Sequence, residues 1–183
     1  MTRRFAPVLA GLAVAMAAFL CRAPGVVYAD AGELLTAVAL KGVAHPPGFP
    51  LYLLLGGLWC DAARLAGAPL ASALNAFSSV CAGVAAGGAT AAANALMDRL
   101  GLAPDRIDRG LLALAGGLLT GFGLTLFDFA QTIEVYALHM AFVAPAVALA
   151  SRPGARRTPG EPGGSPSAPA SQRAGPWLST TPR

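Results

Sequence analysis

The sequence predicts an all-α membrane protein with about four transmembrane helices, short juxtamembrane helices in the first outer loop and a disordered C-terminal tail. Three observations favour this fold class. Of the 183 residues, 55% are apolar and 12% are charged, and the mean hydropathy is +0.59, a balance foreign to ordinary water-soluble domains. The chain has 22 glycines but only 7% aromatic residues, which suits helices packed closely in lipid. Long apolar runs separated by short polar segments are the third observation.

The first apolar run, residues 5–21, follows two arginines and is just long enough to span hydrocarbon. We interpret it as a retained helix. A cleaved signal peptide is the alternative, because residues 27–29 resemble a small-residue cleavage site. The sequence leaves this choice open.

The segment 22–70 is predicted to form the first outer loop. Within it, the apolar stretch 51–60 is bounded by Pro50 and Asp61 and has roughly half the length that a spanning helix needs. We therefore expect this stretch to lie along the membrane surface.

Three further apolar runs are predicted to span the membrane. Two of them carry glycines four residues apart, a small-xxx-small pattern that allows another helix to approach closely. Asn75 and Asn94 are interpreted as interhelical hydrogen-bonding groups. The predicted spans are 71–97, with Gly83 and Gly87; 111–127, with Gly117 and Gly121; and 133–150.

Positive charge decides between topologies, because cytoplasmic loops collect Lys and Arg. With four spans and a cytoplasmic N-terminus, ten of the thirteen positive residues lie inside, and only Arg22, Lys41 and Arg64 lie outside. A fifth span at 51–60 would invert that count. The net charge of +4 thus orients the chain in a membrane, and no nucleic-acid partner is expected. The four-span topology puts these residues at the outer surface: Asp30, Glu33, His45 and Glu134.

Residues 1–150 form the predicted transmembrane portion, and 151–183 form the tail. The tail is mostly Pro, Gly, Ser, Ala and Arg, so it cannot bury enough apolar surface to offset the entropy of ordering. The alanine-rich composition favours a bacterial plasma (inner) membrane as the location of this multi-pass chain.

Asp30 and Glu33 stand three residues apart where a short helix, 31–40, is expected to begin. As a helix start they predict a capping box, in which both side chains bond to free backbone N–H groups. A carboxylate held there beside lipid head groups can also accept a proton from a substrate hydroxyl. The two interpretations are compatible.

The next segment, 41–50, contains three prolines and two glycines, which impose a non-helical path. Within it His45 is a candidate hydrogen-bond donor to a phosphate oxygen, and Lys41 is a candidate positive charge for the same group. The alternative for His45 is a structural bond to a backbone carbonyl.

Glu134 is expected at the outer end of the fourth span, where an ionisable residue is a functional candidate because unpaired burial is costly. A structural bond to a neighbouring helix is its alternative. The sequence assigns no metal ligands. The cofactor stays unknown, and no motif in the sequence predicts a site for a divalent cation.

Four blocks of this sequence resemble the membrane protein O-mannosyltransferase-like family, a branch of the GT-C glycosyltransferases first catalogued as a domain of unknown function. The resemblance covers only the N-terminal portion of such an enzyme, about residues 5–150. The first two blocks are long and specific, and the later two are short but follow in the same order. The blocks are 30–37 (DAGELLTA), 42–52 (GVAHPPGFPLY), 74–78 (LNAFS) and 133–139 (IEVYALH).

The resemblance implies transfer of a hexose, such as mannose, from a polyprenyl-phosphate donor to a hydroxyl acceptor, protein or glycan, at the outer membrane face. Membrane lipid would be the surrounding partner. It implies that Asp30, with Glu33, is catalytic, since GT-C enzymes carry an acidic general base in the first outer loop. The implied substrate-binding residues are Lys41, His45, Glu134 and Tyr136.

This sequence departs from the family pattern at Ala31, where Ser is expected, and at Ala73, where Arg often stands. The later spans of the family are absent, so the sequence leaves open whether the chain is an active enzyme. The alternative is a noncatalytic membrane protein, either a degenerate fragment or a subunit that packs against a separately encoded remainder.

Overall fold

The computed structural model describes residues 2–27, 30–102 and 108–152, and all regular structure in these ranges is helical. The predicted tail beyond residue 152 lies outside the described residues. The helices are α1 (Thr2–Cys21), α2 (Ala31–Leu40), α3 (Pro50–Leu65), α4 (Leu70–Arg99), α5 (Arg109–Gly121), α6 (Leu124–Phe129) and α7 (Val135–Ser151).

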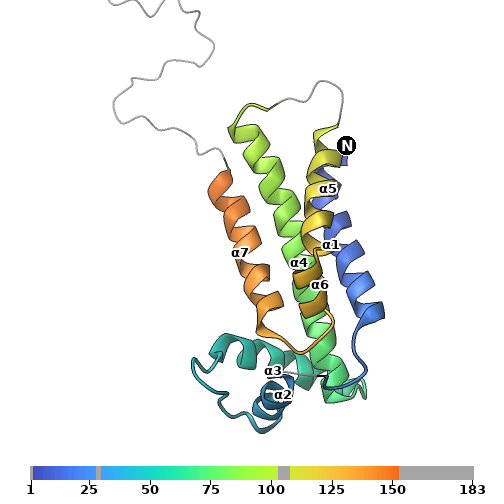
Figure 1. Cartoon of the computed structure of the whole chain (residues 1–183), viewed down its shortest axis with the longest axis vertical. Coiled ribbons are helices and arrows are strands. Elements are labelled where there is room, and N and C mark those ends of the chain that lie inside the picture. Colours follow the sequence, from blue (N-terminus) through green and yellow to red (C-terminus); the bar gives the residue numbers. More distant parts are fainter. Residues whose placement is uncertain (1, 28–29, 103–107, 153–183) are drawn as a thin grey trace, which may run out of the picture. The chain divides into compact units, whose positions relative to one another are not determined.

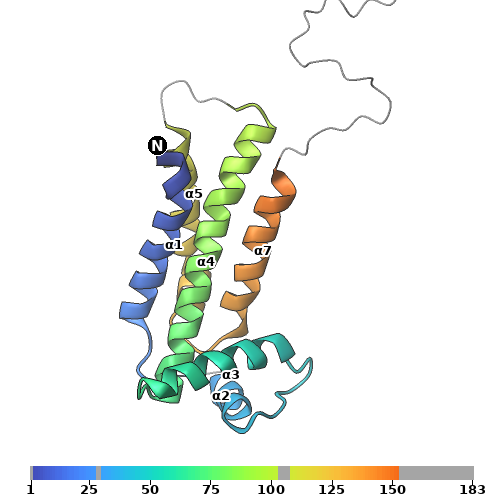
Figure 2. The same ribbon diagram turned by 180° about the vertical axis from the view of Figure 1, so that it is seen from behind.

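The long helix α4 runs through the middle of a bundle and packs against α1, α5 and α7 (Figure 1). The shorter helices α2 and α3 lie across one end of this bundle, next to the start of α4 and the start of α7 (Figures 1 and 2). The helix α3 has 16 residues and extends beyond the apolar stretch 51–60, whose position along a membrane surface stays a prediction. We call this end of the molecule the platform end.

Glycines set how closely the bundle helices approach, as the small-xxx-small pattern predicts. A Cβ at Gly83 would lie 2.6 Å from the Gly11 carbonyl oxygen on α1, and a Cβ at Gly87 would lie 2.8 Å from the Pro7 carbonyl oxygen. On α5, a Cβ at Gly117 would lie 2.8 Å from the Ala86 carbonyl oxygen of α4. These positions therefore bring helix backbones into direct contact, and this part of the prediction is confirmed.

Two helices, α1 and α4, are long and apolar enough to cross a membrane. The predicted span 111–127 is not one continuous helix, because α5 ends at Gly121 and α6 begins only at Leu124, and its crossing of a membrane stays a prediction. Gly123 between them has extended backbone, with ψ at 134°. Glycine disfavours the helical conformation because it loses more backbone conformational entropy than any other residue when it becomes helical. The predicted fourth span corresponds to α7, which has 17 residues.

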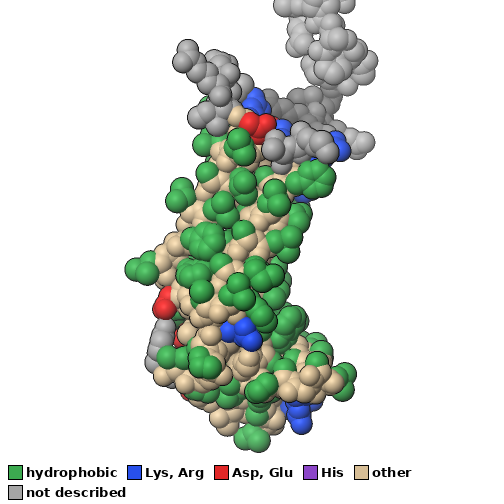
Figure 3. Space-filling view, turned by 90° about the vertical axis from the view of Figure 1, so that its right-hand side faces the viewer, with side chains coloured by type: hydrophobic (Ala, Val, Ile, Leu, Met, Phe, Trp, Pro, Cys, Tyr) green, Lys and Arg blue, Asp and Glu red, His purple; other side chains and the backbone are tan. Residues whose placement is uncertain are grey.

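The apolar and charged side chains are segregated along the bundle. Figure 3 shows a face whose middle is hydrophobic, with Lys, Arg, Asp and Glu towards the two ends. At the end opposite the platform, Asp98 of α4 accepts hydrogen bonds from Arg3 of α1 and Arg109 of α5. The predicted grouping of these arginines at one end is thus present.

Candidate functional site

The platform end brings together three side chains that the sequence analysis singled out. Asp30 is the N-cap of α2, and its carbonyl oxygen accepts the first helical hydrogen bond from Leu34. Its side chain makes no capping hydrogen bond, so the predicted capping box does not form. The Glu33 carboxylate instead turns to the loop that follows α2.

Both oxygens of Glu33 bond to His45. Oε1 accepts from the His45 backbone N–H at 2.5 Å, and Oε2 lies 3.0 Å from His45 Nδ1. These bonds, the backbone one first, hold the pKa of Glu33 below its ordinary value of 4.5. Since an ionised carboxylate only accepts, the proton of this contact belongs to Nδ1. The predicted carbonyl partner for His45 is therefore wrong, because a carboxylate takes that place.

The loop from Lys41 to Phe49 fixes His45 in this position. It leaves α2 through Lys41 in the left-handed region, at φ 52°, and enters α3 through Phe49, also left-handed at φ 45°. Ala44 beside the histidine is buried at 6% exposure, and the Phe49 ring packs against the imidazole edge with centroids 5.4 Å apart. The imidazole is thus held by the bonds of His45 to Glu33 and by the contact with the Phe49 ring.

The second imidazole nitrogen, Nε2, faces Asp30. Its distance to Asp30 Oδ2 is 3.8 Å, and one donor atom from each of Asp30, Glu33 and His45 lies within 4.8 Å of the others. All three residues are exposed, with 40–57% of each side chain accessible. The group forms an open cluster that a solute can reach.

Glu134 is the N-cap of α7 and has extended backbone. It is 6% exposed. Burial raises its pKa, and the negative charge of Asp30 raises it further, while the backbone N–H of Val135 opposes the rise. The charge of Asp30 therefore acts on the Glu134 carboxyl at the start of α7.

Two further buried polar residues, which the sequence analysis did not assign, lie next to each other on α3 and α4. Tyr52 of α3 is 3% exposed and Ser78 of α4 is 1% exposed; their hydroxyls are neighbours, and neither has a well-aligned hydrogen-bond partner among the described residues. Burial raises the Tyr52 pKa, and the Glu134 charge adds to this rise. Both residues lie in the sequence blocks 42–52 and 74–78, which was the signal available for them.

The structure does not bring Lys41 to the cluster. Its ammonium donates to Asp61 Oδ2 of α3 at 3.2 Å, and the pair lines a separate cavity between α2 and α3. The predicted phosphate-binding partnership of Lys41 with His45 therefore has no support in this geometry.

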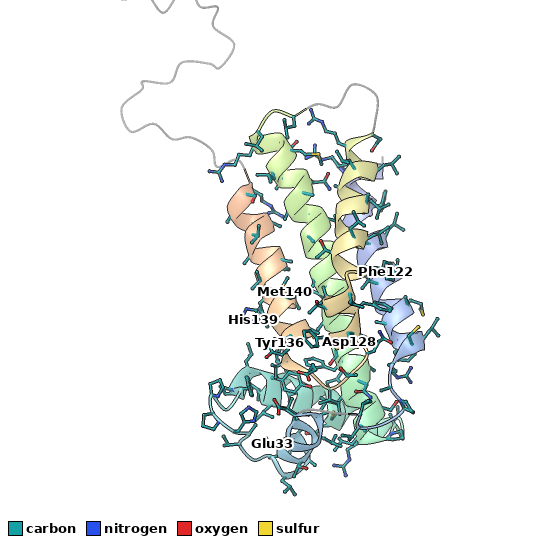
Figure 4. All side chains as sticks on the ribbon, viewed as in Figure 1. Glu33, Phe122, Asp128, Tyr136, His139 and Met140 are labelled. Atoms are coloured by element: carbon teal, nitrogen blue, oxygen red, sulfur yellow. The ribbon has the colours of Figure 1, made fainter. Side chains whose placement is uncertain are left out.

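Tyr136 lies on the first turn of α7 (Figure 4). It is 54% exposed and stacks on Phe129 at 4.8 Å. Together with His139 on the same helix, it lines an apolar cavity of about 430 Å³ between α7 and the start of α3, where Phe49 lies. Phe49, which lines this cavity, also packs against His45 of the cluster.

The arrangement suits two kinds of chemistry. An exposed carboxylate beside a histidine held in one orientation can accept a proton from a hydroxyl group. Two carboxylates and an imidazole at this separation are also a donor set that a divalent cation accepts. In that case Asp30 and His45 Nε2 would be the facing ligands, and Glu33 would orient the imidazole from behind.

A comparison with protein families finds one match. The family model described as "Protein O-mannosyl-transferase TMEM260 N-terminal domain" matches residues 30–162, a range that contains all of the site residues. Neither the curated proteins nor the solved structures include a significant match to the chain.

Proposed function

The chain belongs to the family of the protein O-mannosyl-transferase TMEM260 N-terminal domain, and from this membership we propose that it is the N-terminal portion of a membrane glycosyltransferase. The reaction is transfer of a hexose, mannose by analogy with the family, from a polyprenyl-phosphate carrier to a hydroxyl acceptor at the outer membrane face. The observation that carries the proposal is the convergence of Asp30, Glu33 and His45 within 4.8 Å.

Asp30 is the general base in this proposal. Glu33 has both oxygens engaged by His45, whereas the Asp30 carboxylate is 57% exposed and its contact with His45 Nε2 is long, at 3.8 Å. An incoming acceptor hydroxyl can therefore reach Asp30 without displacing a strong hydrogen bond. As its proton passes to Asp30, the hydroxyl oxygen attacks the anomeric carbon and the lipid phosphate leaves.

Glu33 and His45 position the base and the substrate. The two hydrogen bonds between Glu33 and His45 keep His45 Nε2 directed at Asp30. This limits how the Asp30 carboxylate can rotate. A protonated His45 would also donate from Nε2 to a phosphate or sugar oxygen. Lys41 is left out of the mechanism because Asp61 engages it.

Glu134 and Tyr136 bind the donor. Burial raises the pKa of Glu134, and its carboxyl can accept from a sugar hydroxyl when ionised and donate to one when protonated. The apolar cavity lined by Tyr136 and His139 suits the first isoprene units of the carrier, because it begins next to the polar cluster.

Membrane insertion belongs to the same proposal. Support comes from the two helices of spanning character, the apolar middle of the bundle (Figure 3), and the arginines gathered at the end opposite the platform. By the positive-inside rule, that end faces the cytoplasm and the platform faces outward. A bacterial inner membrane is the proposed location.

The test measures mannose transfer from a radiolabelled polyprenyl-phosphate mannose in membranes containing the protein. Asp30→Asn is compared with Asp61→Asn, since Asp61 lies on the same platform but pairs with Lys41. We expect transfer to be lost in the first variant and kept in the second. If membranes with well-expressed wild-type chain transfer no sugar, the noncatalytic alternative replaces this proposal.

A further inference from the structure

A second polar site lies at the end of the bundle opposite the platform. A cavity of about 430 Å³ opens there between α1, the end of α4 and the end of α7. Its polar lining consists of Arg3, Arg4, Asn94, Asp98 and Arg152. Three positive side chains thus face one negative side chain.

The single carboxylate of this cavity is already engaged. Asp98 accepts from Arg3 through Oδ2 and from Arg109 through Oδ1. Arg4 and Arg152 have no carboxylate partner among the residues that the structure describes. The cavity therefore has excess positive charge, which attracts a phosphate group.

Asn94 provides an independent sign that a ligand belongs in this cavity. The residue is 7% exposed and lines the cavity, and its side-chain oxygen Oδ1 is buried without a hydrogen-bond partner among the described residues. Asn94 Oδ1 therefore does not make the interhelical hydrogen bond that the sequence predicts for this residue. A buried amide oxygen without a donor is costly, and a ligand hydroxyl would satisfy it.

An apolar groove continues from the charged cavity along the bundle. It has a volume of about 630 Å³ and shares Pro7, Ala91 and Arg152 with the cavity. The groove crosses α4 between α1 and α7, which flank that helix on opposite sides (Figure 2). Its lining includes Gly83 and Gly87, where the backbones of α1 and α4 meet.

We propose that this cavity and groove together bind one anionic phospholipid with a hydroxylated head group, of the phosphatidylglycerol type. Its phosphate lies between Arg4 and Arg152, a head-group hydroxyl donates to Asn94 Oδ1, and an acyl chain occupies the groove. The occupant is a lipid rather than another helix because the polar mouth and the apolar groove are continuous. This inference rests on the membrane insertion proposed above, but not on sugar transfer.

The experiment is native mass spectrometry of the full chain, released from detergent after titration with phosphatidylglycerol or with phosphatidylcholine of the same acyl chains. We expect one phosphatidylglycerol per chain to be retained in preference to phosphatidylcholine. The double variant Arg4→Gln/Arg152→Gln should weaken this retention about tenfold or more, given the usual worth of an arginine near an anionic lipid. Val84→Phe, which narrows the groove at a half-exposed position, should weaken it as well.

Matched controls lie elsewhere on the same molecule. Arg22→Gln/Arg64→Gln removes two charges outside the cavity, and Leu119→Phe enlarges an exposed apolar side chain of α5 outside the groove. Both controls should bind phosphatidylglycerol as the wild type does. Glycerol phosphate, which has no acyl chain, should not compete.

Three outcomes of the lipid titration would overturn the inference. They are equal retention of the two lipids, unchanged retention in the Arg4/Arg152 variant, and displacement by glycerol phosphate alone, which would indicate a free anion site. A dimer that excludes the lipid would show that a second copy fills the groove and would also overturn it. Failure of the chain to fractionate with membranes, tested separately by alkaline extraction, would instead remove the proposed membrane function.

Discussion

Glu33 and His45, 12 residues apart in the chain, are joined at the platform by two contacts, one through the histidine backbone N–H at 2.5 Å and one through Nδ1 at 3.0 Å. This pairing links the start of α2 to the loop before α3. Asp30, the other carboxylate of the cluster, has only the longer contact with His45 Nε2, at 3.8 Å. Four predictions concern this site and the bundle that holds it, and a fifth concerns topology.

Asp30→Asn should reduce mannose transfer by about 10²-fold or more, because general base catalysis commonly contributes a factor of that size. The measurement is initial rate of transfer from the lipid-linked donor in membranes, at matched protein levels. Asp61→Asn is the control. Equal rates for wild type and Asp30→Asn would exclude Asp30 as the base.

Glu33→Gln should change the pH dependence of stability in acid. The folded-state pKa of Glu33 is lowered, so its ionised form stabilises the fold fully above pH 4.5, and this contribution is lost as pH falls through the lower folded-state value. The difference in Tm between wild type and Glu33→Gln should therefore shrink below pH 4.5. Thermal denaturation of the detergent-solubilised protein measures it, and a constant difference would contradict the Glu33–His45 pairing.

Glu134→Gln should have the opposite dependence. Burial raises the folded-state pKa of Glu134 above its ordinary value of 4.5, so the folded protein holds this proton more tightly and wild-type stability falls as pH rises through the interval between the two values. Near pH 7 the Gln variant should have the higher Tm, and near pH 4 the two should converge. A lower Tm for the variant at pH 7 would show that the charged form is stabilised by a partner.

Gly117→Ala should destabilise the bundle by about 1–3 kcal/mol, the usual cost of overpacking a helix contact. Its new Cβ would lie 2.8 Å from the Ala86 carbonyl oxygen and 3.0 Å from Thr90 Cβ. Gly116→Ala is a matched control on the same helix, because no atom lies within 4 Å of its new Cβ. Comparable losses of Tm in both variants would refute the close α4–α5 contact.

Cysteine labelling should place the two ends of the bundle on opposite sides of the membrane. Val43 at the platform is 84% exposed and Leu102 beyond α4 is 52% exposed, so a cysteine at either position should be accessible. In a Cys21→Ala background, a membrane-impermeant maleimide should label Val43→Cys from outside and Leu102→Cys only after permeabilisation. Labelling of both from one side would end the proposed topology.

The sequence predicted which residues lie at the site better than it predicted their hydrogen-bond partners. Asp30, Glu33, His45 and Glu134 were expected at one surface, and the structure gathers them at the platform end. Glu33 was expected to cap its own helix, yet it bonds to His45 instead. A capping box is a local pattern, and sequence spacing cannot reveal that a loop returns to offer the same carboxylate a better pair of donors.

Hydropathy and glycine spacing by themselves determined that this chain forms closely packed apolar helices, because those properties depend on neighbours three or four residues away. Only the tertiary structure decided that Lys41 pairs with Asp61, that the Tyr52 and Ser78 side chains are neighbours, and that the third run breaks at Gly123. Each of these depends on which distant groups meet, and a charge or hydroxyl takes the partner that the packed helices bring within hydrogen-bonding distance.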